Sequence, residues 1–332
     1  MQDYLLSCDW GTSSFRLKLV DTLHHEIINE ARSDRGVAII FNRWNTADKE
    51  NKLISLEHAY LNELQQNIQA ISDKVLFDIQ DVPVVISGMA SSVIGMREVS
   101  YTPLPFPLDG SGSTVECIYP TLQCPHKIYL VSGVCSKMDV MRGEETQLIG
   151  LASMRKDIYT AKKILCILPG THSKHVYINQ GSIIDFHTYM TGELFNIIAH
   201  QSILKDAVFG DRALTELSMS QTDAFRCGIH NSQDSNLLHA LFNVRINHLF
   251  KLLTKEDNFY YLSGLLIGSE LNELSKRANG RIVLCSESNV NTLYKQAIQY
   301  LDMIDGTFLI DANIMDNAAL EGHIKILHYQ ID

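Results

Sequence analysis

The same order of short segments occurs twice along this chain of 332 residues, at Tyr4–Val20 and at Ile164–Ile178. Each copy opens with a short apolar run, which predicts a buried strand. It continues through a turn of small and polar residues and ends in an alternating run, which predicts a half-buried strand. Similarity between two halves is what a duplicated fold leaves in a sequence. Because 332 residues also exceed what one core usually holds, we predict two abutting domains, 1–155 and 156–332.

The rest of the chain alternates between predicted strands and helices. Apolar or alternating runs predict further strands at Glu26–Ile28, Val82–Ile86, Lys127–Val131, Ser182–Phe186 and Arg281–Leu284. Apolar residues at helical spacing predict helices at Lys49–Lys74, Gly143–Arg155, Gly192–Asp206, Asn236–Leu253, Tyr260–Lys276, Asn291–Leu301 and Asn317–Leu327. Three prolines keep the segment Tyr101–Pro107 extended.

Composition and charge exclude several classes of protein. Hydrophobic residues make up 45% of the chain and charged residues 20%, as in a soluble globular protein. No window is long and apolar enough to cross a bilayer, and the first residues lack the basic segment of a secretory signal, so we expect a cytoplasmic protein. A net charge of −10 without a basic stripe argues against nucleic acid and anionic membranes as partners. A small anionic substrate in a locally positive pocket remains compatible with that charge.

The cysteines and histidines indicate neither a disulfide framework nor a metal site. Seven cysteines without a Cys-x-x-Cys pair are typical of reduced thiols, although Cys117 and Cys124 flank a loop and have the spacing to pair. Three neighbouring histidines lack a metal-binding spacing, so we expect them to pack in strands or loops; they are His172, His175 and His187.

The two repeated turns, Asp9–Ser14 and Pro169–Lys174, carry residues suited to phosphate. Glycine permits close backbone approach, N–H groups and hydroxyls gather on one concave side, and lysine supplies a point charge. A carboxylate at Asp9 would repel phosphate unless Mg²⁺ lay between them, directly or through water. Each turn alone also fits an ordinary hairpin, but their equivalent places favour a nucleotide clamp. The predicted phosphate-binding residues are Gly11, Thr12, Ser13, Gly170, Thr171, His172, Ser173 and Lys174.

These turns resemble the two phosphate motifs of the actin-like ATPase superfamily, which includes hexokinase. More narrowly, the chain resembles the 2-dehydro-3-deoxygalactonokinase family, through further blocks at Gly88–Met89, Tyr101–Pro103, Asp139–Gln147, Asp185–Leu194 and Leu262–Gly268. The resemblance implies an α/β fold with two ribonuclease-H-like (actin-like ATPase) domains, each a mixed five-stranded sheet flanked by helices, and an active-site cleft between them. It implies ATP and Mg²⁺, and transfer of the γ-phosphoryl group to the 6-hydroxyl of 2-dehydro-3-deoxy-D-galactonate, a step in galactonate breakdown.

The resemblance also assigns the catalytic acid. Sugar kinases of this superfamily place an acid at the start of the helix that follows the region between the motifs. Here that acid is Glu144, the predicted general base, with Asp139 as its competitor. A helix start also favours carboxylates for purely local reasons. The helix start at Thr191–Glu193 fits a cap, with Thr191 as the cap residue, as well as a place near the phosphates.

Substrate residues are expected in the first domain and adenosine contacts in the second. Arg142 fits a bidentate hold on the substrate carboxylate and, equally well, an ordinary ion pair. Where the family carries a polar, arginine-containing stretch after Gly88 and Met89, this chain has an apolar one, and Arg97 is the candidate to stand in, beside Tyr101. The adenosine-side candidates allow either nucleotide approach or close helix packing; they are Gly264 and Gly268.

Three other functions stay open at this point. The first is a phosphohydrolase of the same superfamily, which must orient water and needs no pocket for a sugar acid. The second is a sensing module that binds ATP without turnover, and the third is a kinase of the same fold for another sugar or sugar acid. For partners we expect a small sugar acid and allow for a homodimer.

Overall fold

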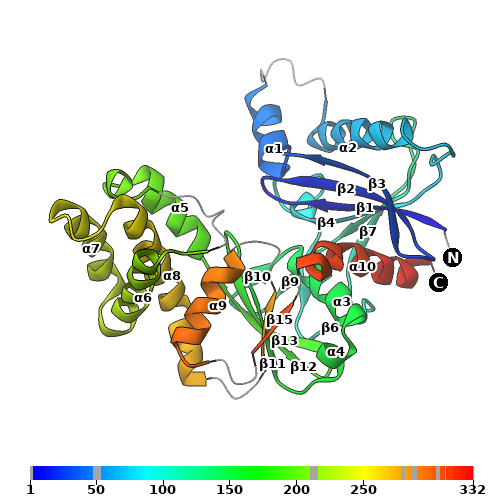
Figure 1. Cartoon of the computed structure of the whole chain (residues 1–332). Helices are drawn as coiled ribbons and strands as arrows, with labels where there is room; N and C mark the ends of the chain where they lie inside the picture. Colours follow the sequence, from blue (N-terminus) through cyan, green and yellow to red (C-terminus); the bar gives the residue numbers. More distant parts are fainter. Residues whose placement is uncertain are drawn as a thin grey trace. The chain divides into compact units, whose positions relative to one another are not determined.

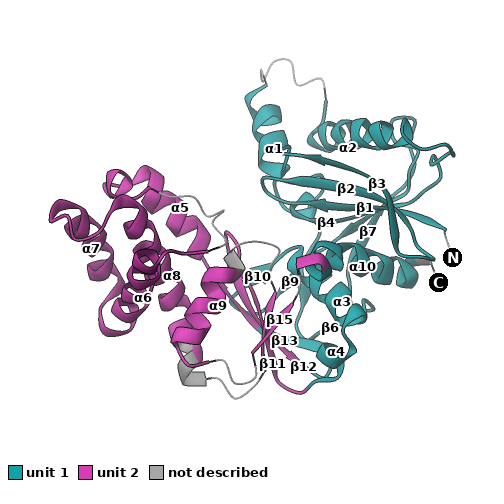
Figure 2. Ribbon diagram, viewed as in Figure 1, with its two compact units in different colours: residues 1–161, 179–185, 314–332 teal, residues 162–178, 186–313 magenta. Residues whose placement is uncertain are grey.

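The computed structural model describes residues 3–47, 54–209, 216–277, 281–285, 290–303, 307–310 and 312–331. The chain forms two compact units (Figure 2). Unit 1 comprises residues 1–161, 179–185 and 314–332, and unit 2 comprises residues 162–178 and 186–313. The first change of unit, after residue 161, lies close to the expected boundary at 155, but the end of the chain returns to unit 1. Each unit has its own core of buried apolar side chains.

Unit 1 contains the first copy of the repeated segments (Figure 1). Its strands are β1 (Tyr4–Trp10), β2 (Phe15–Asp21), β3 (Glu26–Ser33), β4 (Val84–Gly88), β5 (Thr102–Pro103), β6 (Phe106–Pro107), β7 (Val115–Ile118), β8 (Ile128–Val131), β9 (Val134–Cys135) and β10 (Val140–Met141). Its helices are α1 (Val37–Thr46), α2 (Leu56–Ser72), the 3₁₀ turn η2 (Met89–Ser91), α3 (Glu144–Met154), α4 (Lys156–Thr160) and α10 (Ala312–Ile331).

The second copy is followed by a mostly helical region. The strands are β11 (Ile164–Leu168), β12 (Ser173–Asn179), β13 (Ser182–Tyr189), β14 (Arg281–Cys285) and β15 (Thr307–Ile310). The helices are α5 (Thr191–Gln201), the 3₁₀ turn η3 (Lys205–Ala207), α6 (Met219–Asp234), α7 (Leu237–Leu249), α8 (Lys255–Arg277) and α9 (Val290–Tyr300).

The two large sheets share one strand order. The first runs β3-β2-β1-β4-β8-β7 and the second β13-β12-β11-β14-β15, with β6 added beyond β13. In each, the opening strand pairs antiparallel with the next one, β1 with β2 and β11 with β12, and parallel with the strand on its other side, β4 or β14. This confirms the duplicated, mixed-sheet α/β architecture expected for ribonuclease-H-like domains. The expectation of five strands is corrected to six, because β7 and β6 extend the edges. A small third sheet has the order β10-β9-β5.

The helices differ from the predicted ones at two places in unit 1. The helix predicted at Lys49–Lys74 begins only at Leu56, where the Ser55 side chain caps it by accepting the N–H of His58 at 3.2 Å. Residues 49–53 of that prediction lie outside the described residues. An additional helix, α1, follows β3 directly, and its start contacts the first turn.

In unit 2 the sequence analysis missed α6, whose buried face is too small to give an apolar stripe. Four of the five buried residues on that face are small or moderate in size, and the five are Ala224, Phe225, Gly228, Ile229 and Ser232. These small side chains let α6 pack very closely on α8. The start of α6 did carry a signal, a capping box formed by Ser218 and Gln221.

Candidate active site

The first turn is held against the start of α1. The carbonyl oxygen of Thr12 accepts the N–H of Ala38 at 3.0 Å. A Cβ atom at Gly36 would lie 2.4 Å from that carbonyl oxygen, so glycine alone permits the approach. With its carbonyl groups directed at the helix, the turn leaves the side chains of Thr12 and Ser13 exposed on its other side. This arrangement fits an anion nest of N–H and hydroxyl donors.

The second turn is held in the same way by the start of α5. The carbonyl oxygen of Thr171 accepts the N–H of Glu193 at 3.0 Å, and a Cβ atom at Gly192 would lie 2.5 Å from the oxygen of Gly170. Gly170, Thr171 and His172 are exposed, and the Nε2 atom of His172 lies 2.5 Å from a carboxylate oxygen of Glu193. Thr171 therefore occupies the place that Thr12 has in the first turn, and the equivalence extends to the helix that supports each turn.

The buried carboxylate of Glu270 in α8 holds the end of the second turn in place. It accepts hydrogen bonds from the hydroxyls of Ser173 at 2.7 Å and Tyr294 at 2.6 Å, and from the hydroxyl of Thr191. The Nε2 atom of His175 lies 2.9 Å from the same carboxylate. One side chain thus ties the start of β12 to α5, α8 and α9. Burial, together with the Glu270 charge, raises the pKa of the Tyr294 hydroxyl well above its ordinary value.

This network changes the picture of two residues predicted from the sequence. Ser173 has no exposed surface and its hydroxyl is engaged by Glu270, so it holds the turn instead of facing a phosphate. Thr191 is not the helix cap, because Met190 occupies that position and the Thr191 hydroxyl binds Glu270. Lys174 is buried as well, and its Nζ atom donates to the carbonyl oxygen of His172 at 3.2 Å. Sequence reasoning missed Glu270 entirely, because an acid within a long helix usually faces solvent.

In unit 1 two glycines bring the candidate base close to the first turn. Gly88, which ends β4 with a φ of +87°, would place a Cβ atom 2.7 Å from the oxygen of Trp10 and 3.5 Å from a carboxylate oxygen of Asp9. Gly143, with a φ of +108°, would place a Cβ atom 3.3 Å from the Cα of Gly88. Because Gly143 is the N-cap of α3, Glu144 follows at the first helical position. The predicted metal residue and the predicted base therefore flank one pair of glycines.

The start of α3 carries a second carboxylate with a different character. Glu145 is 1% exposed, and both of its oxygens accept the N–H of Gly143, at 2.8 and 3.0 Å. Burial and the neighbouring charge of Glu144 raise the pKa of Glu145 to about 8. Glu144 is only partly buried, and its Oε2 atom accepts the N–H of Arg142 at 3.1 Å. Glu144 is thus the more accessible of the two acids.

Asp139, the competing base, lies in the turn between β9 and β10. Its N–H donates to the hydroxyl of Ser136 at 3.0 Å, and its carboxylate accepts the N–H of Val140 at 2.7 Å. These bonds build the turn. The choice between Glu144 and Asp139 stays a prediction.

Arg142 is held by neutral partners. Its guanidinium donates to the hydroxyl of Ser91 and to the carbonyl oxygen of Val99 at 3.3 Å, and it stacks over the ring of Tyr101 at 4.2 Å. Among the described residues no carboxylate forms an ion pair with this side chain, and its buried Nε atom has no hydrogen-bond partner. Buried unpaired donors are uncommon. The arrangement fits an arginine that binds an anionic ligand.

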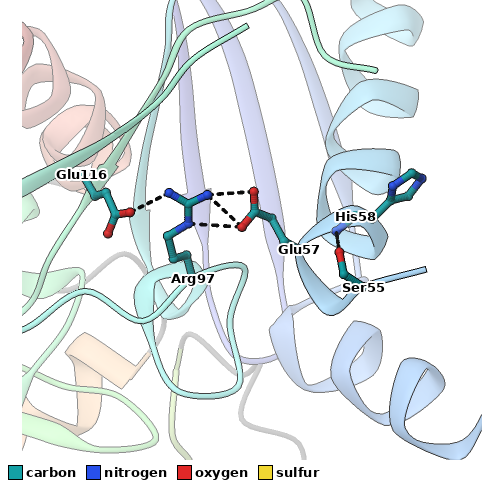
Figure 3. Close-up of polar contacts among 5 residues, drawn as sticks. All are labelled: Ser55, Glu57, His58, Arg97 and Glu116. Atoms are coloured by element: carbon teal, nitrogen blue, oxygen red, sulfur yellow. Dashed lines mark hydrogen bonds and ion pairs between the residues drawn. The ribbon is translucent and has the colours of Figure 1, made fainter. Parts of the chain in front are cut away.

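Arg97 stands in the opposite situation. Its guanidinium forms a salt bridge with Glu57 at 2.9 Å on one side and with Glu116 at 2.6 Å on the other (Figure 3). The hydrogen bond to Glu116 raises the pKa of Arg97 more than any other favourable contact. Two carboxylates therefore already satisfy this arginine, and its substrate role stays a prediction that these ion pairs do not favour.

The glycines expected on the adenosine side pack against α6 instead. A Cβ atom at Gly264 would lie 2.0 Å from the oxygen of Phe225, and one at Gly268 would lie 2.4 Å from the hydroxyl of Ser232. The close-packing alternative accounts fully for both glycines. A cavity of about 240 Å³ opens beside them, between the second turn and the helices α5, α8 and α9; it is lined by Pro169, Gly170, Thr171, Thr191, Gly192, Phe195, Ser263, Leu266, Ile267, Leu293 and Tyr294.

The remaining predictions concern cysteines, metals and membranes. All seven cysteines are free thiols, including Cys117 and Cys124. In the described part of the chain, no three His, Cys, Asp or Glu side chains gather as a metal cluster. Mg²⁺ commonly uses only one or two carboxylates and completes its shell with phosphate oxygens and water, so Asp9 alone beside the first turn fits this ion. None of the described helices has the length and apolarity of a membrane span.

Two turns predicted to bind phosphate and an acidic helix start are the parts that phosphoryl transfer requires. The protein is therefore of the class of kinases that are built on the actin-like ATPase fold. A family model described as 2-keto-3-deoxy-galactonokinase matches residues 9–322. The 2-dehydro-3-deoxygalactonokinase of Escherichia coli (strain K12) is 30% identical over 227 residues, which cover 66% of this chain and 71% of that protein.

Two further relatives extend the similarity over nearly the whole chain. A protein of Rhizobium meliloti (strain 1021) named as a probable 2-dehydro-3-deoxygalactonokinase is 30% identical over 305 residues, 89% of each chain. The crystal structure of a putative 2-dehydro-3-deoxygalactonokinase from Sinorhizobium meliloti is similar to this chain, with a TM-score of 0.77 at 28% identity, over 98% of this chain and 99% of that one. The chain belongs to the 2-keto-3-deoxy-galactonokinase family.

Proposed function

We propose that this kinase transfers the γ-phosphoryl group of ATP to the 6-hydroxyl of 2-dehydro-3-deoxy-D-galactonate, within galactonate breakdown in the cytoplasm. The observation that supports a sugar acid as acceptor is Arg142. This half-buried guanidinium rests on Tyr101 and has no carboxylate partner among the described residues. It suits the carboxylate of an incoming substrate, which it can hold through two parallel N–H donors. A neutral sugar or water would leave this charge unpaired.

We assign the phosphates of ATP to the exposed faces of the two turns. Thr12 and Ser13 supply donors in unit 1, where Gly11 closes the turn through its N–H bond to the carbonyl oxygen of Ser14 at 2.9 Å. Gly170 and Thr171 supply donors in unit 2. Ser173 and Lys174 shape the second turn from inside. When bound at Asp9, Mg²⁺ would supply charge neutralisation for the transferring group. The enzyme's own work is then largely positioning and electrostatic stabilisation.

We assign Glu144 as the base that accepts the proton of the attacking hydroxyl, with Asp139 as the alternative. Glu144 has the first position of α3 and directly follows Gly143, whose backbone lies against Gly88 beside the start of the first turn. A base must lie within hydrogen-bond reach of the proton it removes. Glu145, whose pKa is raised to about 8, holds the Gly143 N–H and so positions the helix start.

The adenosine is assigned to the cavity beside the second turn. Apolar side chains on several walls, Phe195, Leu266 and Leu293, suit a purine ring, while polar groups at the turn suit the ribose and phosphates. Gly264 and Gly268 then contribute indirectly, because their packing on α6 sets the position of α8 and hence of Leu266.

The test is ADP release from ATP with Mg²⁺ in the presence of 2-dehydro-3-deoxy-D-galactonate, its gluconate epimer, neutral hexoses or water alone. We expect release to be stimulated by the sugar acids, most strongly by the galactonate derivative. If no sugar acid stimulates release, the proposed function is wrong. Release in water alone would identify a phosphohydrolase, stimulation by a hexose a different sugar kinase, and ATP binding without release a sensing module.

A further inference from the structure

A second cavity, of about 450 Å³, lies in unit 1 near the end of the chain. Its walls come from the loop after β6, the ends of α3 and α4, and the last turns of α10 (Figure 1). The volume is within the range of small-molecule sites. The lining residues are Leu108, Asp109, Ala152, Ser153, Lys156, Tyr159, Lys325, His328 and Tyr329. None of them belongs to the turns, the acids or the arginines described above.

The lining is cationic although the chain is acidic. Lys156 and Lys325 face one carboxylate, Asp109, which leaves a formal charge of +1 against −10 for the whole chain. In the described part of the chain, neither lysine nor His328 forms an ion pair or a side-chain hydrogen bond. The Oδ1 atom of Asp109 already accepts the N–H and hydroxyl of Ser111, at 2.9 and 2.6 Å. The cavity therefore offers unpaired cations to a ligand.

Two glycine contacts fix parts of the walls of this open cavity. Gly110, with a φ of +95°, lies against α10, where an added Cβ atom would be 3.3 Å from the backbone of Lys325. Gly181, with a φ of +74°, lies against the ring of Tyr159, where an added Cβ atom would be 2.8 Å from the ring. The oxygen of Gly181 also accepts the N–H of Leu108 at 2.8 Å. These contacts hold Lys325, Tyr159 and Leu108 in place.

The chemistry of the lining selects the ligand class. Lysine ammonium groups bind phosphate as point charges. The rings of Tyr159 and Tyr329 offer apolar faces to the C–H groups of a carbohydrate, and the phenol hydroxyls and Asp109 offer partners for its hydroxyl groups. A bare inorganic anion would use only the cations. We propose that this cavity is a second ligand site, separate from the active site, for a phosphorylated polyhydroxy acid.

The position along α3 makes the two sites independent of each other. Glu144 opens α3, whereas Ser153 near its end lines the cavity, and nine residues of helix correspond to about 14 Å. The two helices that carry the lining are packed backbone to backbone, since a Cβ atom at Gly150 would lie 1.8 Å from the oxygen of Ala318. A ligand in the cavity is therefore expected to bind while ATP occupies the phosphate turns.

The experiment measures binding of 6-phosphogluconate to the full-length protein by calorimetry, with the active site saturated by a non-hydrolysable ATP analogue, Mg²⁺ and the sugar acid. We expect one saturable site. The double variant Lys156→Ala/Lys325→Ala is expected to bind at least ten-fold more weakly. The matched control Lys74→Ala/Lys205→Ala, which removes two exposed lysines elsewhere, is expected to bind like the wild type. Gluconate is expected to bind more weakly than 6-phosphogluconate.

The outcomes separate this inference from the proposed function. Absence of binding to the saturated wild-type protein, equal binding by the Lys156/Lys325 variant, or displacement by the ATP analogue would overturn the second site. Equal binding of gluconate would overturn the phosphate preference. The double variant is expected to keep the wild-type unfolding temperature, because neither lysine has a side-chain partner among the described residues. Its turnover is expected within about two-fold of wild type, because neither lysine is among the catalytic groups. The comparison of the Lys156/Lys325 variant with its lysine control locates the bound ligand in this cavity whichever reaction the active site performs.

Discussion

The carboxylate of Glu270 accepts a hydrogen bond from the hydroxyl of Ser173 at 2.7 Å, across 97 residues of sequence. Through this bond a helix that is far from the second turn in sequence holds the turn in position. Three further polar groups contact Glu270, and all of them come from elements that border the second turn or the cavity beside it. Glu270 thus positions the second turn, to which we assign the nucleotide.

Replacing Glu270 by glutamine keeps its shape but removes the charge that accepts three hydroxyl hydrogen bonds. We expect the free energy of unfolding to fall by about 3 kcal/mol, the upper scale for a hydrogen bond to a charged group. The KM for ATP should rise several-fold while the KM for the sugar acid stays near wild type, because only the second turn loses its support. Denaturant unfolding and steady-state kinetics measure both effects. Glu256→Gln, an exposed position of the same helix, is the control; if it behaves alike, the buried network is not the cause.

The two candidate bases are separated by a pair of isosteric variants. Glu144→Gln is expected to lower kcat by roughly 100-fold or more, the usual scale for losing a general base, with little change in the KM for ATP. Asp139→Asn should have a smaller effect, because its carboxylate builds the turn before β10. Single-turnover kinetics of both variants provide the measurement. A normal rate for Glu144→Gln together with a large loss for Asp139→Asn would exchange the roles.

The two arginines are expected to respond differently to the same substitution. Arg142→Lys keeps a charge but loses the planar pair of donors and the stacking on Tyr101, so the KM for the sugar acid should rise at least ten-fold. Arg97→Lys should leave that KM within about two-fold, because Glu57 and Glu116 already occupy the guanidinium and a half-exposed ion pair contributes little. Kinetics with varied sugar acid decide between them. A raised KM for Arg97→Lys alone would return the substrate role to Arg97.

The metal role that we propose for Asp9 predicts a specific change in the Mg²⁺ dependence of activity. Asp9→Asn keeps the size of the side chain but weakens a hard oxygen ligand, so the Mg²⁺ concentration for half-maximal activity should rise at least ten-fold. The binding of ATP without metal should stay close to that of the wild type. Activity titrated with Mg²⁺ and equilibrium binding of ATP in a chelator give the two quantities. A wild-type Mg²⁺ titration would remove Asp9 from the metal site.

The sequence was most informative where a local pattern has one structural solution. The apolar run at Tyr4–Cys8 is buried inside β1, and the equivalent run at Ile164–Leu168 is β11 over the same residues. The repeat of the turn chemistry indicated a duplicated fold, which the strand order confirms. Turns of this kind can be predicted because glycine and hydroxyl residues after a buried strand are typical of a turn.

The sequence was least informative where one residue type serves two purposes. Glycines four apart in a helix allow either a ligand or another helix to approach, and only the backbone of α6 showed which occurs at Gly264 and Gly268. A glutamate within a helix looks exposed until its partners are known, and those of Glu270 come from distant segments. Arg97 and Arg142 likewise differ not in their own sequence but in the carboxylates that the fold brings to one of them.

The buried acid Glu145 makes stability depend on pH in a defined direction. Its pKa is raised to about 8 in the folded protein from an ordinary value of 4.5, so the unfolded chain ionises first as pH rises. The unfolded state is then stabilised, and wild-type stability should decline between about pH 5 and pH 8, by up to about 1.4 kcal/mol per pH unit. Glu145→Gln has no proton to lose, so its free energy of unfolding should approach or exceed that of the wild type as pH rises. Urea unfolding of both proteins at pH 5 and pH 8 measures the difference, with Glu98→Gln, an exposed glutamate of the same unit, as the control. A gap between wild type and Glu145→Gln that stays constant with pH would mean that Glu145 ionises alike in both states.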